Sequence, residues 1–397
     1  MGNQTSSTLQ AKPFMYQLFL RILSFTVVIL ISFSCAVTKR ATKAAINISS
    51  LKYLGAYEIP YDFKYKNTIV GGLSGIDFDA KHDLYYLISD DRADKNPVRF
   101  YCARIFFTQN GIDSLVFTDV INILQPDGSI YPNRSQDPFK NPDPEAIRYN
   151  PLSRQLVWSS EGERVLKSKD NVLVNPSVLL IESNGKYIDS FALPANMVIN
   201  TTEKGPRRNG VFEGMSYADN YKTLFVNIEE PLFEDGPRAD TVENNAFIRI
   251  IKFDVMDKKC IAQYAYKLEK IAYAPKPDSA FKINGASDIL SLGNNKLLVM
   301  ERSSSKGRDP CTIKLFIADL NGATDISFTT LKNNRSFIAA QKTLLLNMDD
   351  LGVYTDNLEG VTFGPLLPNG HKTLLFVADN NFSNTEITQV LLFEVLE

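Results

Sequence analysis

The chain has 397 residues, of which 44% are hydrophobic and 22% are charged, and its formal net charge is −2 at pH 7. This balance is typical of a globular protein, so it excludes a largely disordered chain and a protein with many membrane spans. It also lacks the basic excess that nucleic-acid binding requires.

An export signal is predicted at the N-terminus. Lys12 and Arg21 precede an apolar run over residues 22–33, which ends shortly before Cys35. About a dozen apolar residues are too few for a stable membrane span but are typical of a signal segment. The run is similar to a bacterial lipoprotein signal, in which cleavage leaves a lipid on the new terminal cysteine. Residues 1–35 are therefore predicted to be a signal peptide, with a lipid on Cys35 as the membrane anchor.

This N-terminus predicts an exported protein of the bacterial cell envelope. Plain secretion to the periplasm or the medium, and an uncleaved anchor, are the alternatives. Residues 36–50 begin with three positive charges and no acid, and we expect them to form a flexible tether. No CxxC pair is present, so a structural zinc site is not expected. We also expect free thiols rather than a disulfide between Cys260 and Cys311.

Residues 51–397 contain a phrase that recurs five times at intervals of about 70 residues, which is the mark of a repeat architecture. Each copy has two short runs of apolar, β-branched and aromatic residues with a polar turn between them. This pattern predicts a β-hairpin. The copies are residues 73–91, 144–163, 212–230, 285–302 and 358–381.

Two further strand-like runs follow the hairpin in most units, as at residues 98–107 and 114–124. Four antiparallel strands in each unit make the blade of a β-propeller. The last unit has only three such runs, and an unassigned one at residues 51–59 precedes the first unit. A strand from the N-terminal end would complete the last blade, close the ring and protect both edges.

The sequence therefore predicts an all-β fold, a β-propeller of about five four-stranded blades, or six if one unit has diverged, over residues 51–397. One segment does not fit this pattern. Residues 337–351 show no strand alternation and are predicted to be a short helical insertion.

Acidic residues recur at two positions of the repeat. The end of the second strand of each hairpin carries Asp90, Glu161, Glu229, Glu301 and Asp379. The start of the first strand carries Glu145, Glu213 and Glu359, with serine in the other two units. Because the start of one antiparallel strand lies beside the end of the next, we expect both sets on one rim of the ring.

So many like charges in one place repel one another and require a positive partner. Calcium takes six to eight oxygen ligands in flexible geometry, which suits acids from several blades. The predicted metal ligands are Asp90, Glu145, Glu229, Glu301, Glu359 and Asp379. The alternative is a structural role, in which these acids cap turns and pair with arginines in each unit.

Residues for catalysis and for substrate binding can be proposed from the same pattern. Glu161 and Glu213 are predicted to orient an attacking water, and Arg148 and Arg208 to hold an anionic group of the substrate. The chain has only two histidines, both in predicted turns, and no GxSxG motif, which argues against a Ser-His-Asp hydrolase.

Several of these segments resemble the phytase-like domain proteins, described as having esterase-like activity of phytase. The segments that carry the resemblance are LSGIDFD, DPEAIRYNP, NGVFEGMSYA, LLVMERS and LEGVTF, in this order. The resemblance implies a β-propeller, usually exported from bacteria, that hydrolyses phosphate or other esters. Propeller phytases are similar in binding several calcium ions around a phosphate subsite, and the DPEA segment at residues 143–146 resembles their aspartate-rich strand.

The expected function is therefore calcium-dependent hydrolysis of a small-molecule phosphate ester or related ester by an exported protein, which we expect to be a monomer. Two alternatives remain open. One is a non-catalytic propeller at the cell surface that binds a glycan, a peptide or an envelope partner through its loops. The other is a calcium-dependent sugar-lactone hydrolase.

Overall fold

The computed structural model describes residues 1–4, 45–167, 170–334 and 336–397. The chain divides into two units, Met1–Lys43 and Ala44–Glu397, and all described strands belong to the second. Cys35 and the apolar run of the predicted signal peptide lie outside the described residues. Among the residues that are described, no helix has the length and hydrophobicity needed to cross a membrane.

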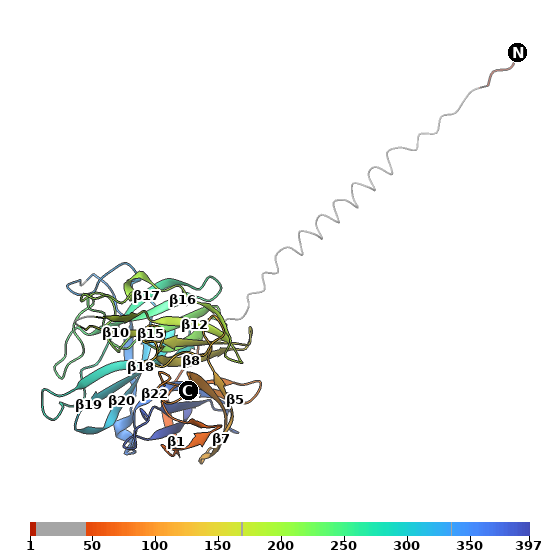
Figure 1. Cartoon of the computed structure of the whole chain (residues 1–397). Coiled ribbons are helices and arrows are strands. Elements are labelled where there is room, and N and C mark those ends of the chain that lie inside the picture. The colour runs from red at the N-terminus through yellow and green to blue at the C-terminus, as the bar shows by residue number, and fades with distance from the viewer. Residues whose placement is uncertain (5–44, 168–169, 335) are drawn as a thin grey trace. The chain divides into compact units, whose positions relative to one another are not determined.

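Five antiparallel four-stranded sheets form the blades of a β-propeller (Figure 1). Blade 1 contains β4 (Leu73–Asp79), β5 (Leu84–Ser89), β6 (Arg99–Thr108) and β7 (Gly111–Asn122). Blade 2 contains β8 (Pro144–Asn150), β9 (Gln155–Ser160), β12 (Ser177–Glu182) and β13 (Tyr187–Ser190). Blade 3 contains β14 (Phe212–Ala218), β15 (Thr223–Ile228), β16 (Phe247–Asp254) and β17 (Lys259–Lys267).

Blade 4 contains β18 (Lys282–Gly293), β19 (Lys296–Ser305), β20 (Arg308–Asp319) and β21 (Gln341–Asn347). Blade 5 contains β22 (Leu358–Gly364), β23 (Thr373–Ala378), β24 (Thr388–Leu396) and β1 (Ser50–Ile59). The small elements between these strands are β2 (Lys64–Tyr65), β3 (Thr68–Ile69), β10 (Glu163–Val165), β11 (Val172–Val174) and the 3₁₀ helix η1 (Ala195–Met197). The predicted all-β propeller is confirmed, with five blades.

The N-terminal strand completes the last blade, as predicted. β1 runs antiparallel to β24, with Ser50 opposite Leu396 and Ile59 opposite Thr388. The first and last strands of the domain thus protect each other's edges, and their pairing joins the two ends of the ring. Blade 5 therefore depends on residues from both ends of the domain.

The helical insertion predicted for residues 337–351 is wrong. Seven residues of this segment form β21, the outer strand of blade 4, and only the 3₁₀ helix η2 (Met348–Leu351) follows it. β21 pairs with β20 through a register shift next to Phe316, and the side chain of Leu344 is 52% exposed. An irregular outer strand of this kind does not alternate strictly between buried and exposed positions, so periodicity did not reveal it.

The hairpins form because the central residues of their second strands are apolar and buried. β15 and β23 are buried at every position, since each lies in a blade that packs between two others. The turns contain residues that adopt positive φ angles, such as Asp83, Asn294 and Asn295, as tight hairpin connections require. Among the described residues the cysteines are free thiols, as predicted.

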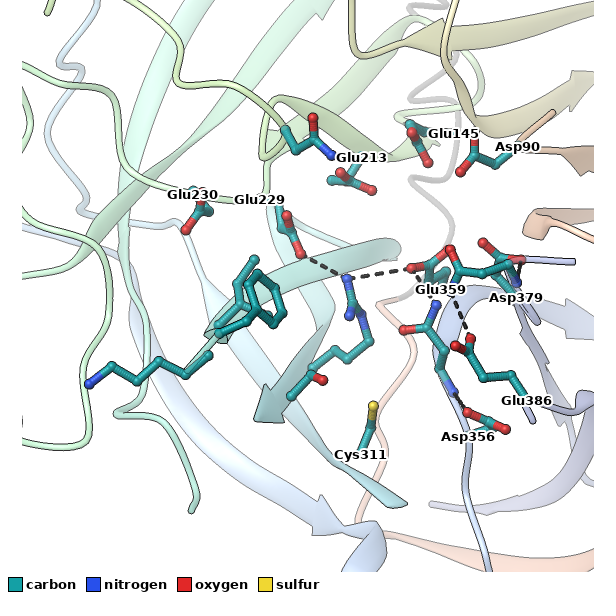
Figure 2. A pocket seen from close by; sticks show the side chains of 18 of the residues that line it. Asp90, Glu145, Glu213, Glu229, Glu230, Cys311, Asp356, Glu359, Asp379 and Glu386 are labelled. Atoms are coloured by element: carbon teal, nitrogen blue, oxygen red, sulfur yellow. Dashed lines mark hydrogen bonds and ion pairs between the residues drawn. The ribbon is translucent and has the colours of Figure 1, made fainter. Parts of the chain in front are cut away.

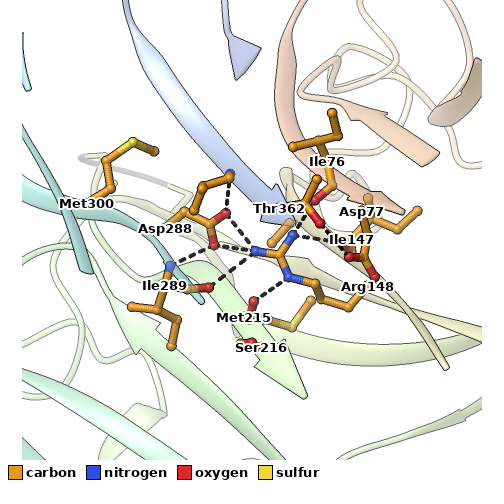
Figure 3. Close-up of polar contacts among 12 residues, drawn as sticks. Ile76, Asp77, Ile147, Arg148, Met215, Ser216, Asp288, Ile289, Met300 and Thr362 are labelled. Carbon is orange, nitrogen blue, oxygen red and sulfur yellow. Dashed lines mark hydrogen bonds and ion pairs between the residues drawn. The ribbon is translucent and has the colours of Figure 1, made fainter. Parts of the chain in front are cut away.

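One buried ion pair joins the inner strands of all five blades (Figure 3). Arg148 on β8 donates to both carboxylate oxygens of Asp288 on β18, at 2.8 and 2.7 Å. It also donates to the carbonyl oxygens of Ile76 on β4 and Met215 on β14. Asp288 in turn accepts a hydrogen bond from the amide of Val361 on β22, at 2.8 Å. This network holds the centre of the ring.

The inner strands approach one another closely around this pair. A Cβ atom on Gly214 would lie 2.5 Å from the Cα of Asp288, and one on Gly75 would lie 2.9 Å from the Cα of Ala146. Both distances are shorter than van der Waals contact, so the close approach of these strands requires glycine at both positions.

Candidate active site

A cavity of about 1120 Å³ lies at the end of the propeller where the inner strands begin. The recurrent acidic side chains of four blades gather around it (Figure 2). Seven of the eight recurrent acids line this one cavity: Asp90, Glu145, Glu161, Glu213, Glu229, Glu359 and Asp379. The structure therefore brings together both acidic positions of the repeat.

One set of acids is held by the backbone ladder of each hairpin. In four blades the residue that follows the second strand donates its amide to the residue before the inner strand. The donors are Asp90, Glu161, Glu229 and Asp379, and their acceptors are the carbonyls of Gly72, Asp143, Val211 and Asn357. The same register in each blade directs the four side chains to the same cavity.

A second set of acids comes from the second residue of three inner strands. Glu145, Glu213 and Glu359 occupy this position in β8, β14 and β22. In β4 the second residue is Ser74. The equivalent residue of the longer strand β18 is Ser287, because both serines lie at the register shift with the second strand. The Ser74 hydroxyl donates to the carbonyl of Glu145 at 2.6 Å, so the serines join neighbouring blades and add no charge.

Glu301 does not line the cavity, and its prediction as a metal ligand there is wrong. It is 1% exposed and accepts hydrogen bonds from the Tyr266 hydroxyl at 2.7 Å and from the Lys342 ammonium at 2.8 Å. In the β18–β19 ladder Ala286 lies opposite Glu301, so the position that follows belongs to Arg302. Counting seven residues from the start of each second strand would have identified Arg302 from the sequence.

Arg302 occupies the place in blade 4 that an acid occupies in the other four blades. Its Nη2 lies 3.0 Å from Oε1 of Glu229 and 3.4 Å from Oε1 of Glu359 (Figure 2). Its Nε is buried and has no hydrogen-bond partner among the described residues. Although burial lowers the pKa of Arg302, the charges of Glu359 and Glu229 raise it above its usual value, so the guanidinium is charged.

The prediction that Arg148 binds substrate is also wrong. Arg148 follows Glu145 by three residues on β8, which places it about 10 Å further along the strand. It does not line the cavity, and its guanidinium is committed to Asp288 and to backbone carbonyls. Its role is structural, as a buried arginine with a paired carboxylate generally is.

Arg208 lies at the rim of the cavity, in a group of three arginines. The side chains of Arg92, Arg134 and Arg208 contact Glu163 at 2.8, 3.3 and 3.2 Å. Arg92 also forms an ion pair with Asp143. The Arg134 and Arg208 side chains are 43% and 54% exposed, so both can reach a ligand that enters the cavity.

The buried carboxylates of the cavity favour the binding of a positive charge. Burial raises the pKa of Asp90 to about 7, against the lowering effect of Arg92, and raises the pKa of Glu359 to about 7 as well. The pKa values of Glu145 and Glu213 lie well above their usual range, first because of burial and then because of neighbouring carboxylates. Arg302 is already beside Glu359, whereas Glu145 and Glu213 form no ion pair among the described residues and ionise fully only when a positive charge joins them.

Two groups of carboxylates in the described chain are close enough to share a metal ion. They are Asp90, Asp143 and Glu145, and Glu145, Glu161 and Glu213, and within each group one oxygen per residue lies within 4.8 Å of the others. Glu145 belongs to both. Carboxylate oxygens from several strands are the donors that a hard cation such as calcium prefers, so the residues present fit such an ion.

Comparison with known proteins bears on the family. The model of a family described as "Esterase-like activity of phytase" matches residues 68–382. No curated protein matches the sequence.

Solved structures similar in fold include a periplasmic gluconolactonase from Pseudomonas aeruginosa, with 11% identity, a TM-score of 0.37, and coverage of 89% of this chain and 97% of that one. Another is an exo-β-1,3-galactanase from Phanerochaete chrysosporium, with 12% identity, a TM-score of 0.41, and coverage of 87% and 64%. Likenesses this distant carry no inference about chemistry. The family match covers most of the chain, and the chain therefore belongs to the phytase-like family.

Proposed function

We propose that the cavity is the active site of a divalent-cation-dependent hydrolase, with calcium as the expected cation, that cleaves a phosphate ester or a related ester of a small molecule. The observation that carries this proposal is the position of Glu145, which two carboxylate groups share inside a cavity where burial raises the pKa of the acids. The family description, which names an esterase-like activity, agrees with it.

Of the two carboxylate groups, the one formed by Glu145, Glu161 and Glu213 is the better cation site. In the other group Asp143 is already neutralised by its ion pair with Arg92. A bound divalent cation would polarise an ester oxygen and lower the pKa of an attacking water. The protein side chains would hold the ion, orient the water and bind the anionic part of the substrate.

Glu213 is the better candidate for orienting the water. Glu161 uses Oε1 to accept hydrogen bonds from the amides of Gly210 and Val211, the latter at 2.7 Å, so this oxygen is already occupied. At the rim, Arg134 and Arg208 are exposed and can pair with a phosphate or carboxylate group through their guanidinium forks.

The direct test is an assay of the purified protein with p-nitrophenyl phosphate, p-nitrophenyl acetate and gluconolactone, first with calcium and then with EGTA. We expect turnover of an ester that the chelator abolishes and added calcium restores. The Glu145→Gln, Glu213→Gln double variant should lose about 100-fold or more in rate. No turnover above that of this variant would overturn the proposal, and hydrolysis of the lactone alone would favour a lactonase.

We also propose that the protein is exported and anchored by a lipid on Cys35. The proposal rests on the sequence of residues 1–35, with its charged start and short apolar run. In a bacterial host, the wild-type protein should fractionate with membranes, and the Cys35→Ser variant should not carry the lipid in mass spectra. An unprocessed N-terminus in the cytoplasm would contradict export.

A further inference from the structure

The charge of the side chains that line the cavity is not the same in every blade. In blade order, the seventh residues counted from the start of the second strand are Asp90, Glu161, Glu229, Arg302 and Asp379. Four blades thus supply a carboxylate at a position where blade 4 supplies a guanidinium. This exception, Arg302, lies between two acids from the neighbouring blades and contacts both of them.

The contacts of Arg302 divide the acids into two sets. Its Nη2 pairs with Glu229 of blade 3 at 3.0 Å and with Glu359 of blade 5 at 3.4 Å. Both carboxylate groups that can share a metal ion leave these two residues out. Those groups draw only on the chain from Asp90 to Glu213, which belongs to blades 1 to 3. Glu229 and Glu359 therefore already have a positive partner in Arg302. Among the described residues, Glu145, Glu161 and Glu213 form no ion pair with an arginine or a lysine, although they can share a metal ion.

We propose that Arg302 is a built-in cation that takes the place of a metal ion on the blade 4 side of the cavity, and so limits binding to one divalent cation on the side of blades 1 to 3. This inference rests on the proposed function for the existence of that one site. It assigns Arg302 a positioning role: without its charge, Glu229 and Glu359 would be left as buried, unpaired carboxylates and would recruit a second ion.

Calcium alone is the probe in the test. The full chain, freed of metal with a chelator, is titrated with calcium in a calorimeter as wild type, Arg302→Gln, Arg302→Lys and Arg238→Gln. Arg238 is a matched control because it also lines the cavity and pairs with an acid, Glu230 at 2.7 Å. It does not occupy the repeat position of Arg302. We expect one ion for wild type, Arg302→Lys and Arg238→Gln, and two for Arg302→Gln.

An unchanged stoichiometry in folded Arg302→Gln protein would overturn the inference while leaving the proposed metal site intact. If wild type binds no calcium but Arg302→Gln binds one ion, the proposed site fails and the role of Arg302 stands. If Arg302→Gln does not fold, Glu229→Gln in the wild-type background decides. The inference expects this variant to keep the calcium affinity within about threefold, because Arg302 already neutralises that acid, and a tenfold loss would contradict it.

Discussion

The guanidinium of Arg148 donates to both carboxylate oxygens of Asp288, at 2.8 and 2.7 Å, although the two residues lie 140 positions apart in the chain. Together with Ile76, Met215 and Val361, the pair connects the inner strands of all five blades. Both residues are almost fully buried, so neither charge has access to water as a substitute partner.

Arg148→Ala should therefore destabilise the propeller strongly. The substitution leaves Asp288 as a buried carboxylate without its counter-ion, which typically costs about 3–5 kcal/mol of unfolding free energy. Urea unfolding followed by fluorescence measures the loss. The Arg148→Met, Asp288→Leu double variant should be less destabilised than Arg148→Ala, because the carboxylate of Asp288 is removed together with its partner. A loss below about 1 kcal/mol in Arg148→Ala would contradict the structural role.

The stability of the metal-free protein should fall as the pH rises. Burial raises the pKa of Asp90 and Glu359 to about 7 and that of Glu230 to about 8, so the folded protein binds more protons than the unfolded chain between about pH 4 and 8. In EGTA, the melting temperature should be about 4 °C or more lower near pH 8.5 than near pH 5.5. Calcium should restore most of this loss at the higher pH. Equal or greater stability at the higher pH in EGTA would contradict the electrostatics of the cavity.

Glu301→Gln should affect stability but not calcium binding. Glu301 lies outside the cavity and accepts hydrogen bonds from Tyr266 and Lys342, and also from the amide of Glu269 at 2.9 Å. Weakening a buried charged acceptor of this kind costs about 1–3 kcal/mol. Chemical unfolding and a calcium titration of the same variant measure both effects. A large loss of calcium affinity with normal stability would show that Glu301 is a ligand after all.

Gly214→Ala should perturb the centre of the ring. Its Cβ would lie 2.5 Å from both the Cα and Oδ1 of Asp288, so β14 and β18 would have to separate. Overpacking of this kind costs about 1–3 kcal/mol. Thermal unfolding measures the change, which is a steric effect because Gly214 is not among the glycines with a positive φ angle. A Gly214→Ala protein as stable as wild type would contradict the close strand approach.

The fold could be predicted from the sequence because its signals are local. Each hairpin carries its own apolar runs and polar turn, and the unpaired run at residues 51–59 indicated the closure by β1. β21 was missed because it is an irregular outer strand whose exposed Leu344 interrupts the alternation. The sequence signal for the type of element is thus weakest at the outer edge of a blade, where one face of the strand meets solvent.

The site was predicted only in part, because residue roles depend on register and depth. A shift of one residue in the second strand of blade 4 exchanged Glu301 for Arg302, and neighbouring strand positions point to opposite sides. Arg148 is close to Glu145 in sequence but lies deeper along β8, where it meets Asp288 from another blade. Contacts of this kind, between residues of different blades, cannot be inferred from the spacing of residues within one unit.

The most direct test of the account is calcium binding by calorimetry, at neutral pH, to wild-type protein and to Glu145→Gln. Glu145 belongs to both carboxylate groups that can share an ion, so its charge should matter more than that of any other single acid. We expect wild type to bind calcium and Glu145→Gln to bind it at least about tenfold more weakly, since affinity follows ligand charge. Absence of binding to wild type, or equal affinity in the two proteins, would contradict the central claim that this cavity is a cation site.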